Sequence, residues 1–154
     1  MAAIKAVALD VDGVLTDGTF WWGMDGSETK RFSFRDIMGI SRARQSGMIF
    51  ALISGEANAL VDRYAEKMKI TNVWQGCREK EAALQLFAQE RGLDLSEICF
   101  MGDDVNDIAA MQIAGFSAAP FDAHEAVLAV AKYVCKRPGG RGAVREMLEF
   151  VATL

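Results

Sequence analysis

The sequence predicts an α/β fold in which a parallel sheet is covered by helices on both faces. Short apolar runs alternate with stretches of helical periodicity along most of the chain, which is typical of such sheets. Acidic and small polar residues directly follow several of these runs, at the strand ends where open parallel sheets bind ligands. We therefore expect one Rossmann-like domain with a ligand site at one edge of its sheet.

The elements can be placed in chain order. The run Ile4–Leu9 (IKAVAL) predicts a buried strand, because it is short and apolar and the breaker Gly13 follows it. Further apolar runs predict strands at residues 48–53, 73–75, 98–101, 116–119 and 133–135. Helical patterns predict helices at residues 37–45, 57–67, 80–91, 107–114 and 125–131, and a last helix at 144–153.

One segment departs from this alternation. Residues 18–35 predict a β-hairpin, with Asp25-Gly26 in its turn. Its two adjacent tryptophans, Trp21 and Trp22, have two interpretations. They pack on the sheet of their own chain, or they form a subunit interface or a flap over the site, as exposed apolar patches commonly do.

Composition excludes several classes of function. The net charge of −4 argues against non-specific nucleic-acid binding, which needs a basic face. No apolar run has the roughly 18 residues of a membrane span, and the N-terminus does not resemble a signal peptide. The three cysteines lack CxxC spacing, which indicates reduced thiols in the core of a cytoplasmic protein.

Two groups of carboxylates predict a metal site. Asp10 and Asp12 follow the first strand, and burying two carboxylates together requires a cation or a shared proton. A second acidic group, Asp103, Asp104 and Asp107, follows the strand at 98–101. If the fold brings both groups to one edge, oxygen ligands of this kind favour Mg²⁺ over zinc. The alternative is that members of the second group only cap the following helix.

Two further positions suit an anion. Ser54 and Gly55 follow the strand at 48–53, where a hydroxyl and backbone N–H groups can bind phosphate or simply cap a helix. Lys80 opens a later helix, and a lone lysine is commonly a solvated surface charge. These residues gain significance from their order along the chain. A carboxylate pair, a serine, a lysine and an acidic cluster follow one another, each at a junction between elements, which favours a shared site over isolated caps and surface charges.

This ordered set resembles the haloacid dehalogenase superfamily of phosphohydrolases. Its four motifs match as Asp10-Val11-Asp12-Gly13, Ser54, Lys80 and residues 102–107 (GDDVND), which together span nearly the whole chain. The resemblance implies an aspartyl-phosphate mechanism. In it Asp10 is the nucleophile, and Asp12 first protonates the leaving alcohol and then activates water.

The same resemblance implies the binding groups. Mg²⁺ would be held by Asp10, the backbone carbonyl of Asp12, and Asp103, with Asp107 or Asp104 in support. Ser54, Gly55 and Lys80 would hold the transferred phosphoryl group. The chemistry agrees, because phosphoryl transfer is stabilised mainly by positioning and by cationic and hydrogen-bonding groups.

Short spacings point to a branch of the superfamily without a cap. The stretches between Asp10 and Ser54 and between Lys80 and Asp103 leave no room for a cap domain, so a neighbouring subunit would have to exclude water. The opening DVDGVLTDG, the hairpin and residues 139–146 (GGRGAVRE) resemble the homotetrameric branch that dephosphorylates 3-deoxy-D-manno-octulosonate 8-phosphate. That resemblance implies a cytoplasmic enzyme of lipopolysaccharide biosynthesis.

Substrate contacts are implied in the same way. Arg35 and Asp36 lie in the segment that matches the substrate loop of this branch, and Arg141 lies in a tail, residues 138–154, that would be mobile and reach a neighbour. Glu56 and Lys67 instead resemble the sister enzymes that act on 2-keto-3-deoxynononate 9-phosphate or N-acylneuraminate 9-phosphate. A non-catalytic accessory subunit is the alternative of another class, although it would not need both Asp10 and Asp12.

Overall fold

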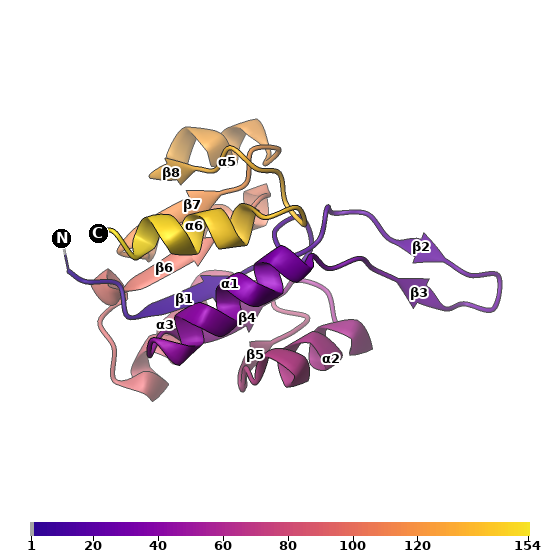
Figure 1. The fold of residues 1–154 in the computed structure, drawn as a ribbon, viewed down its shortest axis with the longest axis horizontal. Coiled ribbons are helices and arrows are strands. Elements are labelled where there is room, and N and C mark those ends of the chain that lie inside the picture. Colours follow the sequence, from indigo (N-terminus) through magenta and orange to yellow (C-terminus); the bar gives the residue numbers. More distant parts are fainter. Residues whose placement is uncertain (1) are drawn as a thin grey trace.

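A six-stranded parallel sheet forms the centre of the computed structural model, which describes residues 2–154 (Figure 1). Its strand order is β5-β4-β1-β6-β7-β8. The strands are β1 (Ala6–Leu9), β4 (Ile49–Ile53), β5 (Asn72–Trp74), β6 (Ile98–Met101), β7 (Phe116–Ala119) and β8 (Tyr133–Val134). The chain winds outward in both directions from β1, which places a topological switch point beside its carboxyl end.

Helices cover both faces of this sheet, as the sequence predicts. One face carries α1 (Phe34–Gln45), α2 (Ala59–Met68) and α6 (Ala143–Val151). The other carries α3 (Lys80–Arg91), α4 (Ile108–Ile113) and α5 (Glu125–Val130). The alternation along β1 shows why the strand is apolar throughout. Val7 and Leu9 enter the first core, and Ala6 and Ala8 enter the second.

Predicted and observed boundaries differ by a few residues at most. The largest shift concerns α1, which begins at Phe34 instead of residue 37. The Ser33 side chain accepts a hydrogen bond from the Arg35 N–H and caps the helix one turn earlier than the apolar pattern indicates. Two short 3₁₀ turns, η1 (Leu95–Glu97) and η2 (Val105–Asp107), flank β6.

The predicted hairpin is present and extends away from the body of the molecule (Figure 1). It pairs β2 (Trp21–Trp22) with β3 (Glu28–Thr29), and Gly26 in its turn has a positive φ of 84°. Trp21 and Trp22 are 75% and 74% exposed, so they do not pack on their own sheet. This exposure excludes the first interpretation, and the subunit interface or flap stays a prediction. No cap domain interrupts residues 2–154.

The segment before α6 lies against the loop that follows β1. The Gly140 N–H donates to the Val14 carbonyl at 3.1 Å, and the Gly139 N–H donates to Asp122. A Cβ on Gly139 would lie 1.8 Å from the Gly13 carbonyl oxygen, so only glycine permits this contact. Residues 139–140 therefore support the loop that carries Asp12, whereas the predicted mobility of the tail stays a prediction.

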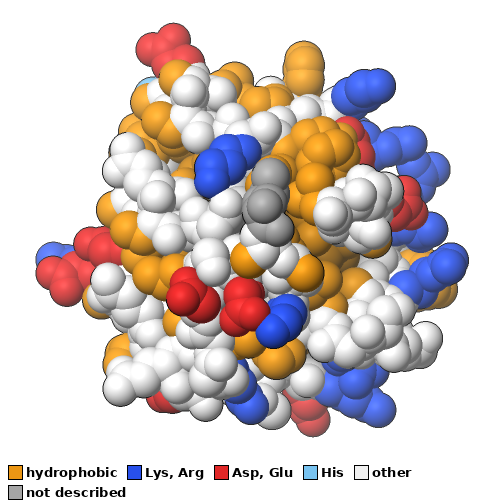
Figure 2. Space-filling model, turned by 90° about the vertical axis from the view of Figure 1, so that its left-hand side faces the viewer, with side chains coloured by type: hydrophobic (Ala, Val, Ile, Leu, Met, Phe, Trp, Pro, Cys, Tyr) orange, Lys and Arg blue, Asp and Glu red, His pale blue; other side chains and the backbone are white. Residues whose placement is uncertain are grey.

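The end of the molecule that faces away from the hairpin carries acidic and basic side chains between apolar ones (Figure 2). Among residues 2–154, no helix combines the length and the apolar character that crossing a bilayer requires.

Candidate active site

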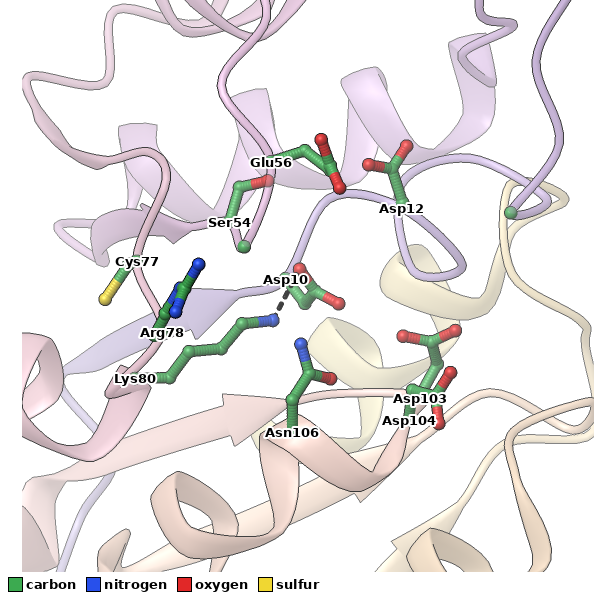
Figure 3. A pocket seen from close by; sticks show the side chains of 12 residues that line it. Asp10, Asp12, Ser54, Glu56, Cys77, Arg78, Lys80, Asp103, Asp104 and Asn106 are labelled. Carbon is green, nitrogen blue, oxygen red and sulfur yellow. Dashed lines mark ion pairs between the residues drawn. The ribbon is translucent and has the colours of Figure 1, made fainter.

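A cavity of about 520 Å³ opens at the carboxyl ends of β1, β4 and β6. Figure 3 shows its side chains converging from loops that are far apart in the sequence. It is lined by Asp10, Asp12, Gly18, Ser54, Gly55, Glu56, Cys77, Arg78, Lys80, Asp103, Asp104 and Asn106. The sheet therefore brings the carboxylate pair, the serine, the lysine and the acidic cluster to one edge, as the order of the motifs predicts.

Asp10 and Lys80 form the floor of this cavity. The Lys80 Nζ lies 2.9 Å from Asp10 Oδ1 and 2.7 Å from Asp107 Oδ1, and all three side chains are buried. Burial lowers the pKa of Lys80, but the carboxylates of Asp10 and Asp107 raise it more, so the pKa lies above its ordinary value. Lys80 is thus a fixed cation beside Asp10 and not a solvated surface charge.

A third carboxylate, that of Asp103, lies close to the two that contact Lys80. Oxygen atoms of Asp10, Asp103 and Asp107 all lie within 4.8 Å of one another. Desolvation raises the pKa of Asp10 to about 7, and Asp107 adds to the effect. Desolvation and the charge of Asp10 raise the pKa of Asp103 to about 9. The ionised cluster therefore needs a further cation, and an all-oxygen donor set fits Mg²⁺.

Asp107 also holds the loop that carries Asp103. Its Oδ2 accepts hydrogen bonds from the N–H groups of Asp103 and Asp104, at 2.9 and 3.2 Å. Asp104 in turn caps η2, so part of the helix-capping alternative applies. The Asp103 carboxylate instead lies against Gly13. A Cβ at Gly13 would lie 1.8 Å from Asp103 Oδ2.

Ser54 and Gly55 follow β4 on the side of the cavity opposite Asp103. Ser54 is buried, and its backbone is fixed by bonds to Trp74 and Cys77. α2 begins only at Ala59 and is capped by Asn58, so Ser54 does not cap the helix. Ser54 lines the cavity, where its hydroxyl can donate a hydrogen bond to a phosphate group.

The partner of Asp12 was not predicted from the sequence. Lys30, just beyond β3, places its Nζ 2.8 Å from Asp12 Oδ1 and 3.0 Å from Oδ2, with a side chain only 3% exposed. In Figure 3 the carboxylate of Asp12 points away from that of Asp10. Arg78 and Asn106 also line the cavity without having been singled out. Their positions in the sequence, two residues before Lys80 and three residues after Asp103, could have indicated that they line the same cavity.

The substrate contact predicted for Asp36 is wrong. Asp36 lies on α1 with no exposed surface, and its oxygens accept hydrogen bonds from the N–H groups of Gly142 and Arg145. It therefore caps the N-terminus of α6, where a carboxylate is favourable. Burial raises its pKa, and these bonds oppose the shift.

The other predicted substrate residues divide between two places. Glu56 lines the cavity of Asp10. Arg35 and Arg141 instead line a second cavity together with Arg31 and Arg137. Lys67 is exposed in the last turn of α2 and lines neither cavity. Within one chain, then, only Glu56 of this group is placed beside the phosphate-binding residues.

Comparison with known proteins decides the family. The 3-deoxy-D-manno-octulosonate 8-phosphate phosphatase KdsC of Escherichia coli K12 is 36% identical over 148 residues, which are 96% of this chain and 79% of that protein. A family model for haloacid dehalogenase-like hydrolases matches residues 74–148. The chain belongs to the haloacid dehalogenase-like hydrolases. It is a phosphatase of this family.

Solved structures agree with this assignment. The octulosonate 8-phosphate phosphatase of Moraxella catarrhalis, in complex with magnesium, phosphate and KDO, superposes with a TM-score of 0.95 at 38% identity, covering 98% of this phosphatase and 87% of that chain. The cobalt-bound phosphatase of Haemophilus influenzae gives 0.94 at 32% identity, covering 98% and 88%. The capless α/β fold predicted from the sequence is thereby confirmed.

Proposed function

We propose that this phosphatase hydrolyses 3-deoxy-D-manno-octulosonate 8-phosphate through an aspartyl-phosphate on Asp10, with Mg²⁺ as cofactor. The observation that carries the proposal is the floor of the cavity. There Asp10 Oδ1 lies 2.9 Å from the buried Lys80 Nζ, with Ser54 and Asp103 on either side. A carboxylate nucleophile beside cationic and hydroxyl donors is the arrangement that phosphoryl transfer needs.

In the first step Asp10 attacks phosphorus and the sugar alcohol departs. Lys80 is held by two carboxylates and can stabilise charge on the phosphoryl oxygens without reorganising, and the Ser54 hydroxyl donates to the same group. When bound at Asp10 and Asp103, Mg²⁺ supplies charge neutralisation for the phosphoryl group. The backbone carbonyl of Asp12 and the carboxylate of Asp107 complete the proposed set of residues around it.

Asp12 carries the proton transfers. It gives a proton to the leaving alcohol in the first step and takes one from water in the second, when the aspartyl-phosphate is hydrolysed. In-line displacement places the leaving oxygen on the far side of phosphorus from Asp10. The outward direction of the Asp12 carboxylate in Figure 3 suits that position.

The substrate follows from the relatives, and Glu56 supports a second candidate. The relatives named above are phosphatases of octulosonate 8-phosphate. Glu56, however, places a carboxylate in the cavity, and this residue resembles the sister enzymes that act on nine-carbon esters. An acidic group there would change which polar groups of the sugar bind, and it favours 2-keto-3-deoxynononate 9-phosphate or N-acylneuraminate 9-phosphate.

Phosphate release from these three esters, compared by kcat/KM with Mg²⁺ present, tests the substrate. We expect the octulosonate ester to be preferred, and we expect Glu56→Arg to increase that preference by about 10-fold or more, the effect of one well-placed polar contact. Glu90→Arg, the same substitution at an exposed glutamate near the end of α3, serves as the control. Preference for a nine-carbon ester in the wild type would transfer the assignment to the second candidate.

We also propose a cytoplasmic homotetramer in which neighbouring copies close each cavity. The hairpin supports this, because Phe20, Trp21, Trp22 and Met24 are exposed on an element that projects from the body (Figure 1). Exposed apolar groups of this extent are typical of interfaces. In such an assembly Lys67, Arg35 and Arg141 of one copy could face the cavity of another.

Sedimentation tests the assembly. We expect the wild type to sediment as a tetramer and Trp21→Asp to shift it to smaller species, because a charge cannot be buried in an apolar contact without a large cost. Leu86→Asp, at an exposed leucine on α3, should leave the assembly intact. A monomeric wild type, or equal dissociation by both variants, would contradict the proposed interface.

A further inference from the structure

Lys30 links the hairpin to the acidic residue that moves protons. Its aliphatic stem and ammonium are almost completely buried although its segment is otherwise exposed, and both oxygens of Asp12 lie within hydrogen-bond distance. A buried lysine is costly unless its charge is paired. This contact is therefore a specific feature of the fold and not an incidental surface ion pair.

The lysine is itself held from the hairpin side. Glu28 Oε2 lies 3.9 Å from Lys30 Nζ and also accepts a hydrogen bond from the Asn58 side chain. Glu28 Oε1 accepts a hydrogen bond from the Trp22 indole N–H at 3.0 Å. A continuous chain of polar contacts thus runs from Trp22 on β2 through Glu28 and Lys30 to Asp12.

We infer that Lys30 is a positioning residue for Asp12: it holds the Asp12 carboxylate turned outward, facing the leaving-group oxygen. A carboxylate has about four acceptor sites on its two oxygens. Lys30 contacts both oxygens of the ionised carboxylate. When Asp12 carries the proton for the leaving alcohol, its O–H faces the leaving-group oxygen and Lys30 keeps its contact with the other oxygen. The inference rests on the proposed mechanism, and it adds a residue that belongs to none of the four motifs.

Leaving groups of different basicity distinguish this role from a merely structural one. A sugar alkoxide needs a proton as it departs, whereas p-nitrophenolate leaves without one. The parameter kcat/KM reports the first phosphoryl transfer. If Asp12 is no longer positioned, kcat/KM should therefore fall much more for the sugar-acid phosphate than for p-nitrophenyl phosphate.

The experiment compares wild type, Lys30→Met, Lys30→Arg and the exposed-site control Lys136→Met on both esters. We expect Lys30→Met to lower kcat/KM for the sugar-acid ester by about 10- to 100-fold and that for p-nitrophenyl phosphate by less than about 3-fold, with partial rescue by Lys30→Arg. Lys136→Met should match the wild type. Equal losses on both esters would overturn the inference.

A double variant supplies an independent check. In an Asp12→Asn background, adding Lys30→Met should lower kcat/KM for the sugar-acid ester only slightly further. The effects of two residues that act as a unit do not add. A full additional loss would show that Lys30 acts on something other than Asp12. If the wild type hydrolyses p-nitrophenyl phosphate but not the octulosonate ester, the proposed substrate fails. The Lys30 comparison then proceeds on whichever alkyl phosphate the enzyme does hydrolyse.

Discussion

Replacing Asp10 by asparagine is expected to lower kcat by a factor on the order of 10⁴ to 10⁶, the loss typical of a missing nucleophile. The amide has nearly the shape of the carboxylate but cannot form the acyl-phosphate bond. Phosphate release under saturating substrate and Mg²⁺ measures the loss. Residual turnover within about 10-fold of wild type would remove Asp10 from the nucleophile role.

The same variant should remain folded. Asp10 adds negative charge to a cluster with Asp103 and Asp107, in which Lys80 contacts only Asp10 and Asp107, and desolvation raises the pKa of Asp10 to about 7. Asparagine removes the repulsion between Asp10 and the other two carboxylates, and it leaves the ion pair between Lys80 and Asp107 in place. In chelator, its melting temperature should therefore equal or exceed that of the wild type. A lower melting temperature would contradict this expectation, and the absence of a cooperative transition would show that the lost activity reflects misfolding.

Removing Mg²⁺ is expected to lower turnover strongly and to make stability depend on pH. Loss of a charge-neutralising ion that contributes several kcal/mol to the transition state should reduce kcat by on the order of 10³-fold. Activity in chelator, followed by restoration with excess Mg²⁺, measures this effect. Full activity in chelator would contradict a metal-dependent mechanism.

The sign of the pH effect follows from the raised pKa values of two carboxyls. Asp10 and Asp103 have folded-state pKa values of about 7 and about 9, above their ordinary value of 3.8. The folded chain therefore binds more protons than the unfolded chain between about pH 4 and pH 9, and metal-free stability falls as pH rises through that range. Melting curves in chelator should show this decline, and Mg²⁺ should stabilise more at pH 8 than at pH 5. A metal-free melting temperature that rises from pH 5 to pH 8 would contradict it.

The part of the site that the sequence predicts is the part built on strand ends. Asp10, Ser54 and Asp103 each follow an apolar run, and parallel strands bring their carboxyl ends to one edge wherever the exact boundaries fall. Lys80 opens a helix, so its position follows from local periodicity in the same way. Local pattern and topology together suffice for these residues.

Long-range contacts of individual side chains could not be predicted in this way. Asp36 and Gly142 are 106 positions apart, and nothing in either neighbourhood indicates that one caps the helix of the other. Lys30 reaches Asp12 only because the hairpin returns the chain to the edge of the sheet. Both depend on how packed elements approach each other, which periodicity does not encode.

The central claim, a covalent phosphoryl group on Asp10, is tested most directly by a rapid-quench single turnover with octulosonate 8-phosphate labelled at phosphorus. Borohydride added after the quench reduces an aspartyl-phosphate to homoserine, which peptide mass spectrometry can locate. We predict transient labelling of the protein at the rate of substrate loss, with homoserine at residue 10 and none in Asp10→Asn. Phosphate release at the full rate from a protein that never carries the label, or homoserine at another aspartate, would contradict the account.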